Sequence, residues 1–102
     1  MAFAVMHYFV YILYSHRLDR FYVGMTGDIQ TRLLQHNHPI DPVKFTSRGV
    51  PWILFLSIQC ESNCQARKME RIIKDKKSRV FIQNLKRYPE LIENTLKQAS
   101  DC

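Results

Sequence analysis

The sequence has few glycines, few cysteines and no long hydrophobic run. With only three glycines among 102 residues, it contains no glycine-rich loop, internal repeat or low-complexity segment, which excludes repeat proteins and glycine-loop nucleotide sites. The apolar stretch near the N-terminus is too short to cross a bilayer and has no basic leader. We therefore expect one domain with neither a membrane span nor a signal peptide.

The cysteines, Cys60, Cys64 and Cys102, are an odd number, which argues against a disulfide framework. Since no leader is expected either, the sequence favours reduced thiols in the cytoplasm. Cys60 and Cys64 with a nearby histidine would make only half of a zinc site, and no second ligand pair follows. Buried or partly exposed thiols are the simpler interpretation.

Basic residues outnumber acidic ones, fifteen to nine, which gives a net charge of +6. Nine of them lie between Ala66 and Arg87 with only Glu70 and Asp75 against them, so this stretch alone carries +7. Such a concentrated patch suits a polyanion such as nucleic acid. The alternative is a solvated helix face, which has the same pattern.

Hydrophobic periodicity predicts strands near residues 8–15, 20–24 and 52–58. It predicts helices near residues 28–37, 63–76 and 78–87, and a further short helix over 90–99, beyond Pro89. The polar stretch between the first two strands is short enough for a hairpin, which would make them antiparallel neighbours.

Tyr11 and Tyr22 lie on these two strands, eleven residues apart. Side chains alternate along a strand, so Tyr11 shares a face with Phe9 and Leu13. On neighbouring strands the two phenols would come close together and could take part in phosphate chemistry. The alternative is simple packing, the usual role of strand aromatics.

Arg32 and His36 follow on the helix that Thr26-Gly27-Asp28 would cap. At about 100° per residue, both border the stripe formed by Ile29 and Leu33, where a purely solubilising charge is unexpected. A guanidinium offers a planar fork for phosphate oxygens, and an imidazole exchanges protons near neutral pH. Alternatively, the arginine stem packs with its head in water and the histidine satisfies a backbone carbonyl.

Glu70 is a lone carboxylate on the next predicted helix, which starts with a capping box from Ser62 to Gln65. It lies at the edge of the apolar stripe of that helix, formed by Ala66, Met69 and Ile73. One carboxylate is enough to hold Mg²⁺ when water and substrate phosphates complete the octahedron. The alternative is an i,i+4 ion pair with Lys74.

In their order and spacing these residues resemble the GIY-YIG nuclease family, and most closely its small stand-alone bacterial members. Phe9-Val10-Tyr11 stands at the first tripeptide and Tyr22-Val23-Gly24 at the second; Arg32 follows ten residues after Tyr22 and His36 one helical turn later, with Glu70 on a later helix. The resemblance covers about residues 7–85. Phe9, Val10 and Val23 depart from the motif at packing positions.

The resemblance implies an α+β fold: a single GIY-YIG-like domain with a three-stranded antiparallel sheet flanked by helices. We expect this nuclease domain over residues 7–87 and a C-terminal helical tail over 88–102.

The implied activity is metal-dependent hydrolysis of phosphodiester bonds by an endonuclease that leaves 5′-phosphate and 3′-hydroxyl ends. Tyr11 would be the general base or proton shuttle, Tyr22 its supporting phenol and His36 an aid to proton transfer. Arg32 would stabilise phosphoryl charge, and Glu70 would bind one Mg²⁺ or Mn²⁺.

The expected substrate is DNA rather than RNA, in a structure-specific or repair-related role, with a separate protein to target the enzyme. Residues expected to contact nucleic acid are Lys44, Arg48, Lys74, Lys77 and Asn84. Two alternatives stay open at this point. One is a catalytically inactive nucleic-acid-binding module that uses the basic helices, and the other is a structural or partner-docking domain.

Overall fold

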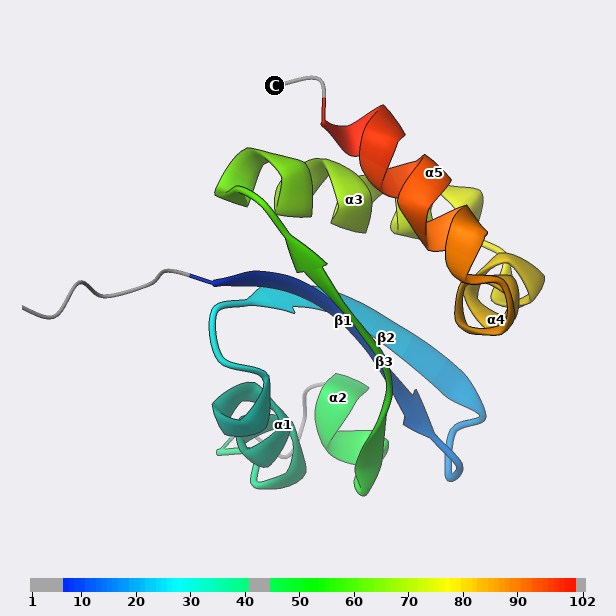
Figure 1. Cartoon of the computed structure of the whole chain (residues 1–102). Coiled ribbons are helices and arrows are strands. Elements are labelled where there is room, and N and C mark those ends of the chain that lie inside the picture. The colour runs from blue at the N-terminus through cyan, green and yellow to red at the C-terminus, as the bar shows by residue number, and fades with distance from the viewer. Residues whose placement is uncertain (1–6, 41–44, 101–102) are drawn as a thin grey trace, which may run out of the picture.

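A three-stranded antiparallel sheet lies between two layers of helices in the computed structural model, which describes residues 7–40 and 45–100 (Figure 1). The strands are β1 (Tyr8–Ser15), β2 (Arg20–Thr26) and β3 (Trp52–Cys60), in the order β2-β1-β3. The helices are α1 (Ile29–Asn37), α2 (Phe45–Arg48), α3 (Asn63–Lys76), α4 (Arg79–Arg87) and α5 (Pro89–Ala99). The predicted α+β fold is confirmed. The short helix α2 was not predicted.

The central strand β1 is apolar on both sides because both faces of the sheet are covered. Val10 and Ile12 point to one face, and Tyr11 and Leu13 point to the other; all four are buried. This is the pattern expected of a strand with no solvent-facing side. The strand therefore joins two separate clusters of buried side chains.

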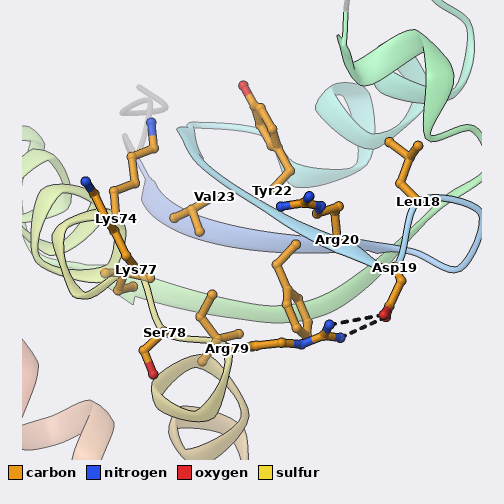
Figure 2. A pocket seen from close by; sticks show the side chains of 12 residues that line it. Leu18, Asp19, Arg20, Tyr22, Val23, Lys74, Lys77, Ser78 and Arg79 are labelled. Carbon is orange, nitrogen blue, oxygen red and sulfur yellow. Dashed lines mark hydrogen bonds and ion pairs between the residues drawn. The ribbon is translucent and has the colours of Figure 1, made fainter.

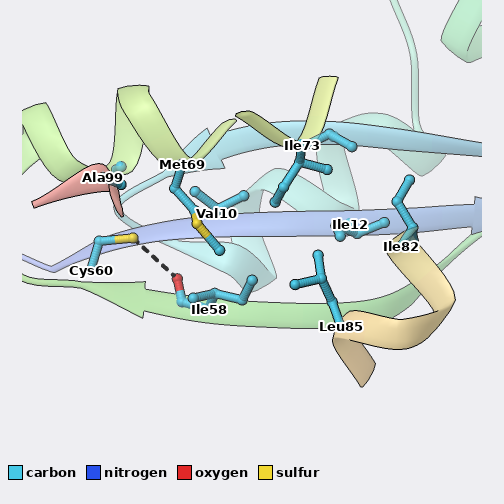
Figure 3. Close-up of a cluster of buried hydrophobic side chains, with 11 residues drawn as sticks. Val10, Ile12, Ile58, Cys60, Met69, Ile73, Ile82, Leu85 and Ala99 are labelled. Carbon is cyan, nitrogen blue, oxygen red and sulfur yellow. Dashed lines mark hydrogen bonds between the residues drawn. The ribbon is translucent and has the colours of Figure 1, made fainter. Parts of the chain in front are cut away.

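The helices α3, α4 and α5 cover one face with aliphatic side chains (Figure 3). The predicted stripe of α3 is buried as expected, and Leu85 of α4 and Ala99 of α5 close the cluster. The C-terminal helix α5 packs against α3 and contributes to this core. The boundary predicted after residue 87 stays a prediction.

The helices α1 and α2 lie on the other face, over an aromatic cluster built around Tyr11 and Trp52. Asn37, the last residue of α1, holds the start of β3. Its Nδ2 donates to the Trp52 carbonyl at 2.9 Å, and its Oδ1 accepts the Trp52 backbone N–H at 2.6 Å. The Trp52 indole donates to the Thr46 carbonyl at 2.6 Å, which holds α2 as well. These contacts fix α1 relative to the sheet.

Two helices begin where the capping residues predict. Asp28 accepts the Thr31 backbone N–H at 3.1 Å at the start of α1, and Ser62 accepts that of Gln65 at 3.0 Å at the start of α3. The reciprocal half of the α3 box is displaced by one residue, because Gln65 Oε1 accepts the backbone N–H of Glu61. Both caps satisfy a backbone N–H in the first turn and so fix where α1 and α3 begin.

No helix in the described part of the chain is long and apolar enough to cross a membrane.

Cys60 is a buried free thiol, as expected, whereas Cys64 is disulfide-bonded, contrary to the expectation of a thiol. The cytoplasmic location stays a prediction.

Candidate active site

The register of the hairpin brings the two predicted tyrosines onto one face of the sheet. Tyr11 pairs with Gly24, and Tyr22 pairs with Leu13, so the phenols are diagonal neighbours with ring centroids 6.3 Å apart. Gly24 leaves the space that the Tyr11 ring occupies, since a Cβ there would lie 2.5 Å from Tyr11 Oη. Gly24 of the second tripeptide thus leaves room for the ring of Tyr11 from the first tripeptide.

Arg32 and His36 of α1 both reach the hydroxyl of Tyr11. Arg32 Nε donates to Tyr11 Oη at 3.2 Å, and His36 Nε2 lies 3.0 Å from the same oxygen. The two residues are one helical turn apart, so both side chains lie on the side of α1 that faces Tyr11. The structure therefore brings together, around one phenol, the four residues of β1, β2 and α1 that the sequence singles out.

The two α1 residues differ in exposure. His36 is only 7% exposed, whereas Arg32 is exposed and also donates from Nη1 to Gln35 Oε1 at 3.0 Å. The expectation that both border a buried stripe thus describes His36 better than Arg32. An exposed guanidinium anchored through Nε remains accessible to an anion from solvent.

Tyr22 completes the cluster as an aromatic wall. Its ring meets that of His36 edge-on, with centroids 4.8 Å apart, and that of Trp52 at 6.1 Å. The imidazole is thereby held between the phenols of Tyr11 and Tyr22.

The surroundings favour neutral forms of both Tyr11 and His36. Burial raises the pKa of Tyr11 above its ordinary 10.0, and although the Arg32 hydrogen bond lowers it, the burial dominates. Burial also lowers the pKa of His36 below 6.5, and the charge of Arg32 adds to this effect.

Glu70 lies on α3, which packs against β1 and β2 on the face of the sheet opposite α1. Its charge adds a little to the raised pKa of Tyr11, and no hydrogen bond or ion pair among the described residues joins Glu70 to Tyr11, Arg32 or His36. Glu70 Oε1 also accepts from Lys74 Nζ at 2.6 Å, which is the ion pair that the sequence left as the alternative. The Glu70 side chain is 21% exposed and that of Lys74 is 52% exposed. A pair of this kind contributes only a few tenths of a kcal/mol.

The donor set at Glu70 fits a hard divalent cation in one limited way. Among residues 7–40 and 45–100, no three histidine, cysteine, aspartate or glutamate side chains gather to hold a metal. Mg²⁺ often keeps several waters and binds through one or two carboxylates with substrate phosphates. Glu70 can serve as that carboxylate, because the weak Lys74 pair is readily exchanged.

The residues expected to contact nucleic acid are dispersed. Lys74 and Lys77 line a groove beside β2 that Tyr22 also lines (Figure 2). Arg48 is exposed on α2, and Asn84 is half-buried on α4, away from that groove. Lys44 lies outside the described residues.

Sequence reasoning missed the residues that position α1. Asn37 and Gln35 have no motif of their own, because an amide near a helix end is compatible with many roles. Their function as clamps depends on the backbone of β3 and the side chain of Arg32, which are brought near only by folding.

A comparison with known protein families matches residues 7–86 to the GIY-YIG catalytic domain. The chain belongs to the GIY-YIG family. The match covers most of the chain and agrees with the extent predicted from the motifs. No curated protein and no solved structure gave a significant match. GIY-YIG domains are endonuclease domains, which makes nucleic acid the substrate class and phosphodiester hydrolysis the reaction of this family.

Proposed function

We propose that this GIY-YIG domain is an active, divalent-metal-dependent endonuclease that cuts DNA at the cluster of Tyr11, Tyr22, Arg32, His36 and Glu70. The observation that carries the proposal is the convergence of Arg32 Nε and His36 Nε2 on the buried Tyr11 hydroxyl. A module that only binds nucleic acid needs exposed cations. It has no need for a phenol buried between a guanidinium and an imidazole.

Tyr11 moves the proton in this proposal. With His36 neutral and Nε2 unprotonated, Tyr11 Oη accepts from Arg32 and donates its own hydrogen to His36. As an attacking water loses its proton to Tyr11 Oη, the phenol proton passes to His36 Nε2. Tyr11 thus acts as a shuttle and never has to exist as a free phenolate, which its raised pKa disfavours.

Arg32 stabilises the negative charge that develops on the phosphoryl oxygens. Its exposed side faces solvent while its Nε and Nη1 are held by Tyr11 and Gln35, so the guanidinium is oriented before a phosphate arrives. Such preorganised charge is a large source of rate enhancement in phosphoryl transfer.

Glu70 would hold the metal, and a divalent ion there would supply charge stabilisation at the leaving oxygen. Mg²⁺ or Mn²⁺ suits a carboxylate ligand. Release of Glu70 from Lys74 frees the ammonium for a neighbouring phosphate. Tyr22 holds His36 in place and offers its hydroxyl to the substrate.

The test is incubation of the purified chain with labelled single-stranded, duplex, flapped and branched DNA and with RNA, each with Mg²⁺, with Mn²⁺ and with a chelator. We expect metal-dependent cuts that leave 5′-phosphate ends, most rapid on one of the DNA substrates. Glu70→Gln and Arg32→Gln should each abolish detectable cleavage.

The matched control is Lys97→Gln on α5, which removes an exposed charge from the helix layer on the opposite side of the sheet from α1. Cleavage that survives in Glu70→Gln and Arg32→Gln as well as in Lys97→Gln would refute the catalytic role of the cluster. Salt-sensitive binding with no cleavage of any substrate would favour the alternative, a nucleic-acid-binding module that has lost activity. Cleavage that requires added cell extract would indicate a separate targeting protein.

A further inference from the structure

A groove of about 720 Å³ runs beside the outer edge of β2, between that strand and the junction of α3 and α4 (Figure 2). Within the described part of the chain, β2 has a strand neighbour on one side only. The polar backbone groups on its other edge therefore have no sheet partner.

The groove carries a marked positive charge. Its lining contains four cations and one carboxylate: Arg20, Lys74, Lys77, Arg79 and Asp19. The carboxylate is already neutralised, since Asp19 pairs with both terminal nitrogens of Arg79 at 2.8 and 3.1 Å. Among the described residues, Arg20 and Lys77 have no ion-pair partner. These two charges are available to a bound anion.

Lys77 has a backbone conformation that a lysine does not favour. At the C-terminal end of α3 it adopts φ 47° and ψ 40°, the left-handed region where glycine is preferred. A lysine there is strained relative to glycine, and its side chain lines the groove. Strain kept at one residue is a reason to look for a function of its side chain.

Tyr22 is the one member of the proposed catalytic cluster that lines the groove. Tyr22 lines it and packs against His36, and Lys74 lines it and holds Glu70. In Figure 2, the Tyr22 hydroxyl and the Lys74 ammonium point toward the same side of the view, and the Asp19–Arg79 pair lies at the opposite end. A strand whose scissile phosphate lies at Tyr11 would therefore enter a positively charged path.

We infer that this groove binds the sugar-phosphate backbone of the strand being cut, on one side of the scissile phosphate, chiefly through Arg20 and Lys77. The inference rests on the proposed function for the position of the scissile phosphate. The ligand is a short run of phosphodiesters, and the Asp19–Arg79 pair marks its far end. Contacts of this kind hold the strand without reading its sequence.

The experiment measures binding of the full chain to single-stranded DNA and RNA by fluorescence anisotropy in chelator, across a salt series. The double variant Arg20→Gln, Lys77→Gly should reduce the slope of log affinity against log salt by about 1.4, or about 0.7 for each lost phosphate contact. The matched control, Arg17→Gln with Lys97→Gln, removes the same charge from exposed residues that do not line the groove, and it should leave the slope nearly unchanged.

Two further measurements separate the groove from general electrostatics and from misfolding. Lys77→Gly alone should raise the melting temperature, because it relieves the left-handed backbone, while it weakens binding. Neutral methylphosphonates placed one at a time along the strand should weaken wild-type binding on one side of the cut position only. That penalty should vanish in the double variant.

A double variant with the salt slope of the control, or a methylphosphonate penalty that persists in it, would overturn the inference. Equal slopes on DNA and RNA support recognition of the backbone alone. If the groove variants reduce the salt slope as expected but no substrate is ever cut, the proposed catalysis fails, and what stands is phosphate binding by the groove without a cut position. If DNA is cut but the groove variants change neither the slope nor the methylphosphonate penalty, the proposed catalysis stands and the groove assignment fails.

Discussion

The two faces of the sheet share one central strand but are built from different chemistry. Toward α3, α4 and α5, β1 contributes Val10 and Ile12 to a cluster of aliphatic side chains. Toward α1 it contributes Tyr11 and Leu13 to an aromatic cluster that also encloses the polar group of His36. Alternation along a single strand thus separates a dry core from a polar site by one residue.

The contrast between the two faces indicates how the fold tolerates the free-energy cost of burying polar groups at the site. Burying a phenol, an imidazole and part of a guanidinium is unfavourable unless each finds a partner. In the described residues every buried side-chain nitrogen and oxygen has one. On the aliphatic face the buried polar side chains of Gln65 and Thr95 also have partners, and the apolar side chains supply the hydrophobic stabilisation. Substitutions on the two faces should accordingly separate activity from stability.

The largest effect is expected from Tyr11→Phe on the aromatic face. Loss of the hydroxyl removes the proton shuttle and should lower the cleavage rate by about 10² to 10⁴-fold. The ring stays in place, so the free energy of unfolding should fall by only about 1 kcal/mol. Single-turnover cleavage measures the loss of rate, and urea unfolding measures the change in unfolding free energy. An active Tyr11→Phe enzyme would contradict the proposed mechanism.

Leu85→Ala tests the opposite face. Leu85 is 0% exposed, and its truncation should cost about 2–5 kcal/mol of unfolding free energy. The folded fraction should keep its cleavage rate, since the residue lies across the sheet from Tyr11. Val80→Ala on the same helix is the control, because Val80 is 62% exposed and should change stability by less than about 0.5 kcal/mol. A specific rate that falls with Leu85→Ala would show that the faces are coupled.

Gly24→Ala disturbs the seat of Tyr11 without removing a reacting group. The new methyl would lie 2.5 Å from Tyr11 Oη, so the phenol must shift, and a displacement near 1 Å costs about 10²-fold in rate. Gly27→Ala is the milder control, because its Cβ would approach only the His7 carbonyl, at 3.3 Å. Cleavage assays on both variants, with circular dichroism to verify folding, decide the point. Equal rates would mean that Tyr11 needs no exact position.

The smallest effect is a pH dependence from His36. Since its folded pKa lies below 6.5, the unfolded chain takes up the proton first as pH falls. Stability should therefore decrease from pH 6.5 down to the folded pKa and then stay level with respect to this group. Cleavage should fall over the lower part of that range, as His36 itself becomes protonated. Urea unfolding measures the stability across this pH range, and cleavage assays measure the rate. Each is compared with the same measurement on His36→Gln. A His36→Gln protein with the same pH dependence would assign it to other groups.

Local patterns were enough to predict most of the elements. The strand of alternating apolar and aromatic residues, the caps Asp28 and Ser62, and the stripe of α3 are read from neighbours a few positions apart. The helix α2 was not predicted from the sequence, because its four residues give too little hydrophobic periodicity. The hydrogen bonds between Asn37 and Trp52 were not predicted either, because these residues are fifteen positions apart and no local sequence rule connects them.

The sequence by itself determined which residues belong to the family motif, because spacing along strands and helices is a property of the local backbone. It also determined the net positive charge and where that charge is concentrated. Only the tertiary structure decided that Arg32 and His36 converge on one oxygen, and that Lys74 holds Glu70 while lining the groove of Arg20 and Lys77. The physical reason is that hydrogen bonds and electrostatic fields act over a few ångströms. Those distances are set by how β2, α1 and α3 pack, which no single segment specifies.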